Sequence, residues 1–386
     1  MKIIHCCLSQ FYIDGYGYQE NILPKMHNLQ GHEVSILAST ETYIDNKKMG
    51  YVEPSSYHTE CGIPISRIPY RKFLPNSVMR KLRIYSGVKD ALYAFNPDII
   101  FIHDIQFISI VDIVDYVKKN PNTKIFVDGH TDFVNSARNW ISKNILHRLI
   151  YKWCAKKIEP YTEKFYGVLP ARVEFFKSMY DISKEKVELL LMGLDDSVVD
   201  FNKKEEIRSK IRKELSINME DFVIITGGKI DRRKNIHNLM RAINELNLSN
   251  IKLIIFGSPN DDMMNEFEKQ LNNELIKYIG WIKAEEVNDY IMASDLGVFP
   301  GTHSVLWEQS IGLGLPCVFR EWEGIQHVDL GGNCAFIKNG NVDEIKEVIT
   351  VIYNDSELYS EMLRVSTEKG IPKFSYYQIA KKAIEK

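Results

Sequence analysis

The chain has 386 residues and a net charge of −2 at pH 7, with 45% hydrophobic and 26% charged residues. This length suits two α/β domains better than one, and the composition is that of an ordinary globular protein. The balanced charge argues against a general nucleic-acid-binding protein. The six cysteines form no Cys-x-x-Cys pair, which argues against a disulfide framework or a zinc site and favours the cytoplasm.

The first half of the chain alternates helical patterns with short apolar runs. The N-terminal run MKIIHCCLSQ is too short and too polar for a secretory signal, so we expect a first strand there. No apolar stretch reaches the roughly 18 residues needed to span a bilayer. The expected strands cover 2–8, 32–38, 98–104, 124–130 and 165–170, with a helix over 19–31. Such continuous apolar strands predict a parallel sheet covered by helices on both faces.

The second half repeats this pattern after a Gly- and Asp-rich stretch at 192–201 and a charged helix at 205–215. Its expected strands cover 221–229, 251–258, 276–281, 295–301 and 315–321, with helices at 236–247 and 284–295 between them. The sequence therefore predicts an α/β protein with two Rossmann-like, doubly wound domains, 1–196 and 197–370, facing across a cleft. A ligand is expected at the carboxyl ends of the strands.

A basic segment follows the first strand of the second half. GGKIDRRKNIHNLM (227–240) turns at Gly227 and Gly228 and then places four cations before a helix, namely Lys229, Arg232, Arg233 and Lys234. Cations at a helix N-terminus oppose the helix dipole unless an anion neutralises them. The strand, glycine and helix context favours a phosphate site. A solvated basic turn is the alternative.

Several segments together resemble the retaining GT-B glycosyltransferases of the family 4 type, which includes many bacterial polysaccharide and lipopolysaccharide enzymes. They are 227–240, DGYGYQENILPKMHNLQGHEV (14–34), FNPDIIFIHD (95–104), 168–201 and 274–301. The resemblance implies metal-independent, retaining transfer of a sugar from a UDP- or GDP-sugar to a glycan or lipid-linked acceptor in surface polysaccharide synthesis. It also implies that the last helix, within 371–386, packs back on the first domain.

The resemblance assigns donor-binding residues. The family places an Arg and, five residues later, a Lys on the donor diphosphate; here Lys229 and Lys234 stand at these positions, so Lys234 with Lys229 or Arg233 should grip it. Replacing Arg by Lys keeps the charge but loses the bidentate fork. The other donor candidates are the glycines Gly15, Gly17 and Gly228, and Trp281 with Ile282 beside the base.

Polar residues at two strand ends of the first half are the other candidates. His130, in DGHTDF (128–133), matches the family's active-site histidine, which implies contact with the transferred sugar or the reaction centre; an imidazole can donate or accept a proton near neutral pH. Asp132 follows it. His103 and Asp104 end a second strand and would orient the acceptor, with a purely structural histidine as the alternative.

The donor-sugar motif of the family is the least well matched. Relatives carry two glutamates separated by seven residues, whereas FPGTHSVLWEQSIGLGLPCVF (299–319) has a shorter loop and lacks the first one. The turn Thr302, His303 and Ser304 would then bind the sugar. Glu308 is the favoured ligand of the ribose hydroxyls, with Gln309 as the alternative.

No metal or other cofactor is expected. The chain has no Asp-x-Asp strand end, and Asp261-Asp262 is interpreted as a helix cap. The family's mechanism implies that the departing phosphate takes the acceptor proton, and no carboxylate pair for double displacement stands out.

The stretch RNWISKNILHRLIYKWCAKK (138–157) carries six Lys or Arg and no acid, with Ile141, Ile145, Leu149 and Trp153 four residues apart. Either this stripe faces the core, or the helix lies on an anionic membrane surface. The second alternative would place the protein at the inner face of the cell membrane. RKFLPNSVMRKLR (71–83) adds five cations.

Two rival functions stay open at this point. A sugar-nucleotide 2-epimerase can use the same fold without an external acceptor. A GT-B subunit without catalysis, which only binds a glycan or a partner, is suggested by the missing first glutamate.

Overall fold

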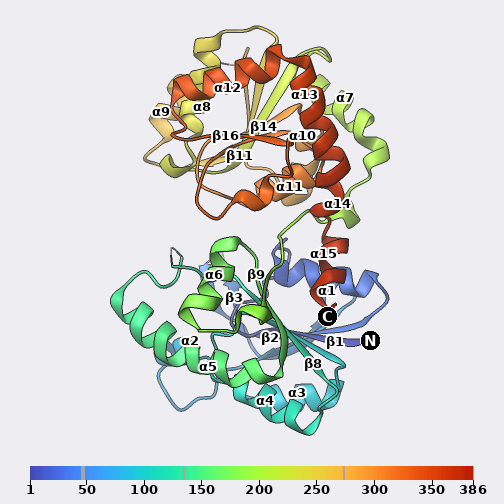
Figure 1. The fold of residues 1–386 in the computed structure, drawn as a ribbon, viewed down its shortest axis with the longest axis vertical. Coiled ribbons are helices and arrows are strands. Elements are labelled where there is room, and N and C mark those ends of the chain that lie inside the picture. Colours follow the sequence, from blue (N-terminus) through green and yellow to red (C-terminus); the bar gives the residue numbers. More distant parts are fainter. Residues whose placement is uncertain (45–47, 134, 273, 386) are drawn as a thin grey trace. The chain divides into compact units, whose positions relative to one another are not determined.

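The computed structural model describes residues 1–44, 48–133, 135–272 and 274–385. The chain divides into two compact units: residues 1–192 with 379–386, and residues 193–378. Each unit is built on its own sheet flanked by helices (Figure 1). None of the described helices combines the length and the apolar character that a membrane span requires.

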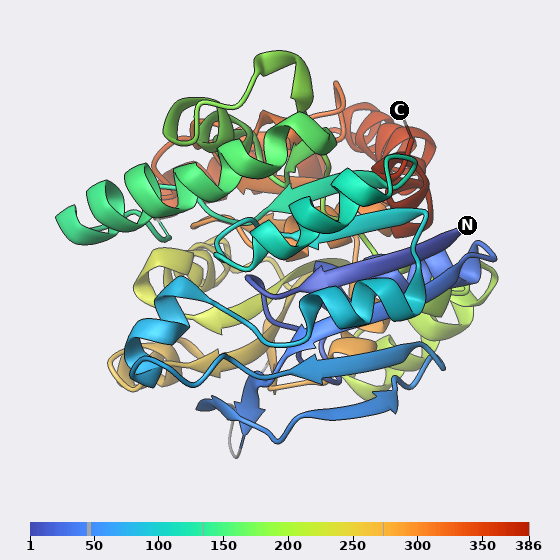
Figure 2. The ribbon, with the colours of Figure 1, turned by 90° about the horizontal axis from the view of Figure 1, so that it is seen from below.

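The first unit contains an eight-strand sheet among its described residues, in the order β10-β9-β8-β7-β1-β2-β6-β5. Neighbouring strands are parallel except for the β5–β6 pair. The strands are β1 (Lys2–Cys7), β2 (Glu33–Ser39), β5 (Ser55–His58), β6 (Pro64–Ile68), β7 (Ile99–His103), β8 (Lys124–Gly129), β9 (Thr162–Gly167) and β10 (Val187–Leu189), with a separate hairpin of β3 (Glu41–Ile44) and β4 (Lys48–Tyr51). The sheet is seen from below in Figure 2.

Helices cover both faces of this sheet. Alternate residues of β1 separate the faces: Ile4 and Cys6 enter the large core, while His5 contacts α1 through His27. The helices of this unit are α1 (Gln19–Leu29), α2 (Asn76–Leu82), α3 (Val88–Phe95), α4 (Ile110–Lys119), a π-type helix at Ser142–Tyr151 continued by α5 (Lys152–Ile158), and α6 (Pro170–Met179).

The second unit contains a six-strand sheet among its described residues, in the order β13-β12-β11-β14-β15-β16, and all neighbours are parallel. Its strands are β11 (Phe222–Ile230), β12 (Ile251–Pro259), β13 (Ile276–Gly280), β14 (Leu296–Phe299), β15 (Cys317–Arg320) and β16 (Cys334–Ile337). Its helices are α7 (Lys204–Glu214), α8 (Ile236–Leu246), α9 (Met264–Gln270), α10 (Ala284–Met292), α11 (Leu306–Gly312), α12 (Val342–Asn354), α13 (Ser356–Val365) and α14 (Ile371–Lys373), with a π-type turn at Ser366–Gly370. The expected doubly wound α/β class with two Rossmann-like domains is confirmed.

The boundaries of the units differ from the expected ones by a few residues. The first unit ends at Met192 rather than at residue 196, and the returning segment begins at Ile379 rather than at residue 371. The reason is a short pairing within the second unit, where Leu194 N donates to Phe374 O at 2.7 Å and Tyr376 N donates to Leu194 O at 3.0 Å. The last helix, α15 (Tyr376–Ala383), enters the first unit, and its Ala380 carbonyl accepts a hydrogen bond from His27.

Candidate functional site

In the second unit, the segment after β11 forms a tight turn before α8. Asp231 caps it, because its Oδ1 accepts hydrogen bonds from Arg233 N at 3.0 Å and Lys234 N at 3.2 Å. The cations therefore lie in a 3₁₀ turn, Arg232–Lys234, and α8 itself starts only at Ile236. Aspartate at such a cap satisfies backbone N–H groups that would otherwise lack a partner.

Lys234 ties this turn to the loop after β14. Its Nζ donates to Thr302 O at 2.8 Å and to His303 O at 2.9 Å, and Thr302 N donates to Arg233 O at 2.9 Å. The backbones touch so closely that a Cβ on Gly301 would lie 2.3 Å from Arg233 O. Burial lowers the pKa of Lys234 to about 8. The turn and the loop are thus one rigid arrangement around a partly buried ammonium group.

The other three cations of the segment do not face this loop. Arg233 binds Asp231 Oδ2 at 2.8 Å and its side chain is 69% exposed. Arg232 points to Asp262 and Glu266, and Lys229 is exposed. Lys229 and Arg233, the two other candidates for binding the diphosphate, are therefore both on the surface in this structure.

The glycines of this strand end allow a close approach of β11 and β12. Gly228 has a φ of +98°, and Gly257 has a φ of +112°, where a Cβ would lie 1.8 Å from Gly228 O. A hollow next to them is lined by Thr226, Gly227, Lys234, Ile236, Phe299, Gly301, Thr302, Ser304 and Trp307. The sequence thus brings the basic turn, the glycine strand and the loop Thr302–Ser304 to one place.

Glu308, the favoured ribose ligand, is buried between two histidines. Its carboxylate is fully buried at the start of α11, and Oε1 lies 2.8 Å from both His303 Nε2 and His327 Nε2. Burial alone would raise the pKa of Glu308, but these two imidazoles lower it to about 2. Both histidines contact the same oxygen of the carboxylate, and binding of the ribose hydroxyls by Glu308 stays a prediction. The alternative, Gln309, donates to Asn288 Oδ1 at 2.7 Å.

The two candidates for contact with the base follow β13 directly. Trp281 is 62% exposed and Ile282 is partly exposed, at the carboxyl end of a strand of the second sheet. Their role at a nucleotide base stays a prediction. In the first unit, Gly15 and Gly17 are exposed, and a Cβ on either would meet no atom within 4 Å, although the φ of Gly15 is +72°.

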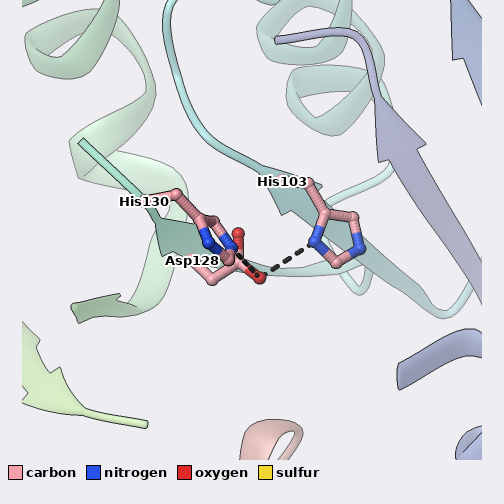
Figure 3. A group of neighbouring side chains, drawn as sticks. All are labelled: His103, Asp128 and His130. Atoms are coloured by element: carbon pink, nitrogen blue, oxygen red, sulfur yellow. Dashed lines mark hydrogen bonds and ion pairs between the residues drawn. The ribbon is translucent and has the colours of Figure 1, made fainter. Parts of the chain in front are cut away.

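His130 stands at the end of β8 with its ring directed at carboxylates. Its Nε2 lies 3.6 Å from Asp128 Oδ2 and 3.8 Å from Glu20 Oε1, and its side chain is 13% exposed (Figure 3). Burial would lower the pKa of His130, but the charges of Asp128 and Glu20 outweigh it, so that the pKa is raised. A protonated or hydrogen-donating imidazole at a strand end can stabilise a developing negative charge.

The neighbouring strand end differs from expectation. His103 is 0% exposed and Asp104 is 2% exposed, so neither side chain can orient an acceptor from solvent in this structure. Asp104, at a φ of +63°, instead accepts hydrogen bonds from Gln106 and from Thr131 Oγ1 at 2.7 Å. Asp132 is partly buried and lies 3.5 Å from Arg172.

Two clusters of described residues bring metal-ligating atoms within 4.8 Å of one another: His103, Asp128 and His130, and His303, Glu308 and His327. In both, nitrogen atoms converge on one carboxylate oxygen, and the shorter contacts, 2.8–2.9 Å, are hydrogen-bond lengths. His327 Nδ1 is buried without a partner, whereas metal-ligating histidines almost always donate their other N–H to an acceptor. The clusters fit hydrogen bonding better than metal coordination, and metal independence stays a prediction.

Comparison with known proteins supports the fold and identifies a family match within the second unit. Residues 207–368 match the family model described as glycosyl transferases group 1. The chain has the GT-B fold, and the residues that match this family model lie in its second unit. The turn at Lys234, the loop Thr302–Ser304 and the Glu308 cluster all lie within these matched residues.

Two curated relatives match about half of the chain. An uncharacterized glycosyltransferase of Methanocaldococcus jannaschii is 20% identical over 216 residues, 54% of this chain and 55% of that protein. The putative teichuronic acid biosynthesis glycosyltransferase TuaC of Bacillus subtilis is 25% identical over 171 residues, 42% of each chain. This chain therefore spans about half the length of the curated relatives it matches.

Solved structures match over nearly the whole chain, and they show the fold alone. HepE of Anabaena, solved in complex with UDP, has a TM-score of 0.66 and 14% identity, covering 99% of this chain and 98% of that chain. The UDP-GlcNAc 2-epimerase of Neisseria meningitidis has a TM-score of 0.61 and 12% identity, covering 100% and 98%. Because transferase and epimerase share the fold, function has to be argued from the site.

Proposed function

We propose that this protein is a glycosyltransferase that transfers a sugar from a nucleotide-diphosphate donor, a UDP- or GDP-sugar, to a glycan or lipid-linked acceptor in surface polysaccharide synthesis. The transfer proceeds with retention of the anomeric configuration and without a metal. The observation that carries this proposal is the placement of Lys234 within the residues that match the group 1 family model, between a glycine-rich strand end and the loop Thr302–Ser304.

The chemistry of the donor explains why Lys234 matters. Cleavage of the glycosidic bond adds negative charge to the outer phosphate, and this charge needs a fixed cation or N–H donors. A lysine ammonium has three N–H donors, and two of those of Lys234 bind the carbonyls of Thr302 and His303. The third N–H is available to a phosphate oxygen. The ammonium is therefore oriented before the donor arrives, which is what electrostatic catalysis requires.

In the first unit, His130 is proposed to act on the transferred sugar or the reaction centre. Its raised pKa keeps it protonated further into the neutral range than an ordinary histidine. The departing phosphate is proposed to accept the proton of the acceptor hydroxyl, so that His130 serves as a hydrogen-bond donor rather than as the base.

The helix at residues 142–158 supports a second element of the proposal, peripheral attachment to an anionic membrane at the inner face of the cell membrane. The expected apolar stripe is on the surface and not in the core: Ile141 is 58% exposed, Leu149 63% and Trp153 42%, and the neighbouring Trp140 is 70% exposed. Exposed Arg148 and Lys157 flank it. An apolar stripe bordered by cations fits the interface of an anionic leaflet.

The segment 71–83 lies next to this helix, because Tyr151 Oη donates to Lys81 O at 2.8 Å. Phe73 in this segment is 59% exposed. One of its five cations turns inward, however, since Arg83 donates to Ser9 Oγ and Gln106 O. The surface offered to a membrane therefore has fewer cations than the sequence suggested.

One assay separates the proposed activity from its rivals. The protein is incubated with a panel of UDP-, GDP- and ADP-sugars after thermal-shift screening against UDP, GDP and ADP. Slow hydrolysis of one donor supports a transferase. Interconversion of the C2 epimers of the sugar would indicate an epimerase. Absence of both reactions would indicate a binding subunit. Lys234→Met should abolish the hydrolysis, whereas Lys346→Met, at a surface ion pair of the same unit, should not.

A further inference from the structure

Three histidines form a continuous buried chain on one face of the first sheet. His27 Nε2 lies 2.8 Å from the Ala380 carbonyl oxygen, and His27 Nδ1 lies 3.0 Å from His5 Nε2. His5 Nδ1 lies 3.0 Å from His103 Nε2, and His103 Nδ1 lies 2.9 Å from Asp128 Oδ2. All three rings are 0% exposed, so no water molecule from bulk solvent can replace these partners.

The number of protons in this chain follows from its two ends. A backbone carbonyl and an ionised carboxylate can only accept hydrogen bonds. The four contacts therefore need four protons, one for each contact. Three neutral imidazoles carry only three protons. If no proton were added, one of the four contacts would bring two bare lone pairs together inside the protein, which is costly in a low-dielectric interior.

The surroundings decide where the additional proton resides. Burial lowers the pKa of His27 to about 4, and burial together with the neighbouring imidazoles lowers that of His5. His103 alone of the three touches an anion. Asp128 Oδ2 also accepts from Gln19 Nε2 at 3.0 Å, and His103 and His130 lower the pKa of Asp128 against the effect of its burial. Among the arrangements that satisfy all four contacts, an ionised Asp128 beside a protonated His103 is the one that places the additional charge next to an anion.

We propose that His103 is a permanently protonated positioning residue, locked by His5, His27 and the Ala380 carbonyl of α15, and that its pair with Asp128 sets the charge and the orientation of His130. The same Asp128 oxygen lies 3.6 Å from His130 Nε2, so His103 and His130 share one carboxylate (Figure 3). The other carboxylates facing this pair are Glu20 of α1 and Asp104, and Arg172 faces His130. The role of His130 in this inference rests on the proposed function, whereas the charge of His103 does not.

The proton count gives a matched pair of variants at His27. A leucine at position 27 removes the link to the carbonyl, which leaves two contacts for two rings and no need for an additional proton. A glutamine keeps a donor for Ala380 and an acceptor for His5, so the additional proton is still required. His27→Leu should therefore neutralise His103 without touching it, and His27→Gln should not. His58→Leu, at an exposed histidine of the same unit, controls for general effects of losing a ring.

The test is ¹⁵N NMR of the imidazole nitrogens in the full-length protein between pH 6 and 9, with His103→Asn used to assign the signals. The inference expects both nitrogens of His103 to stay protonated throughout this range in the unmodified protein, in His27→Gln and in His58→Leu. In His27→Leu one of them should be unprotonated. A neutral His103 in the unmodified protein, or a His103 that titrates within this range, overturns the inference, as does a His27→Leu protein whose His103 keeps both protons.

A second readout tests the positioning role. When His103 is neutral, the whole charge of Asp128 acts on His130 and raises its pKa further. The alkaline limb of the pH profile of donor hydrolysis, where His130 loses its proton, should therefore move to higher pH in His27→Leu, and the maximal rate should fall by roughly tenfold to a hundredfold. The affinity for UDP should not change, because Lys234 lies in the other unit. A His27→Leu enzyme with unchanged rate and pH profile would refute the positioning role. Absence of any donor hydrolysis in the unmodified protein would count against the proposed function and leave the NMR result to decide the charge.

Discussion

Replacing Lys234 by methionine tests the proposed donor site, because methionine keeps much of the apolar stem and removes the ammonium group. A hydrogen bond to a charged group contributes about 1.5–3 kcal/mol. Losing the one N–H that is not bound to Thr302 or His303 should therefore weaken UDP binding by about tenfold to a hundredfold. Isothermal titration calorimetry at pH 7 and fixed low salt measures this, and Lys346→Met serves as the control.

The pKa of Lys234 predicts a second, independent effect in the same experiment, a dependence of UDP affinity on pH. Burial places that pKa at about 8, below the ordinary value of about 10.4, so the ammonium is charged at pH 7 and mostly neutral at pH 9. A bound phosphate favours the charged form, and affinity should be nearly complete at pH 7, be about halved at pH 8 and fall by up to about tenfold by pH 9. The methionine variant should lack this fall. Equal UDP affinity of variant and parent at pH 7, or a parent affinity that does not change up to pH 9, would refute the reasoning.

Three further predictions concern other parts of the structure. Glu308→Gln should lower the free energy of unfolding by about 3 kcal/mol at pH 7, because the pKa of Glu308 is about 2 in the folded chain and about 4.3 in the unfolded chain. The difference in stability between parent and variant should vanish as the pH falls from 4 to 2. Urea unfolding at several pH values measures this difference, and a difference that does not change with pH would contradict the prediction. Leu149→Glu should weaken flotation with anionic vesicles by more than tenfold at low salt, with a smaller difference from the parent at high salt because salt screens the repulsion of the new carboxylate, whereas Leu358→Glu in the second unit should not; equal flotation of both variants would exclude the helix as the contact. Gly301→Ala should reduce UDP affinity without unfolding the unit, because its Cβ would push the loop away from the Lys234 turn; a full affinity for UDP would show that the two need not touch.

The central strands could be predicted because burial on both faces makes them apolar throughout. The strands that the sequence did not predict, β5, β6 and β16 among them, lie toward the edges of their sheets. In β5 and β6, residues such as Ser56, Ser66 and Arg67 interrupt the apolar pattern. The hairpin of β3 and β4 was also missed, and it lies outside both large sheets.

The candidate site was predictable where one segment contains all its parts. The Gly-rich strand end and Lys234 are neighbours in sequence, whereas the partners of Glu308 are 5 and 19 residues away, on a loop and a 3₁₀ turn. Nothing in the local pattern distinguishes a buried glutamate from one that binds a ligand. Nothing in the sequence pattern indicated that His327 would contact Glu308.

The histidine chain could have been suspected from the strands themselves. His5, His103 and Asp128 interrupt otherwise apolar runs on three adjacent strands. The parallel register places them on one face, and a polar residue inside a fully buried strand requires a partner. The contribution of His27 and of the Ala380 carbonyl depends on how α1 and the last helix pack on that face, which the sequence pattern does not specify.

A crystal structure of the protein with UDP tests the central claim most directly. The diphosphate is expected to lie in the second unit at the strand end of Gly228, with Lys234 Nζ within hydrogen-bond distance of a phosphate oxygen. A diphosphate bound elsewhere on the chain, with Lys234 still engaged only by the carbonyls of Thr302 and His303, would contradict it.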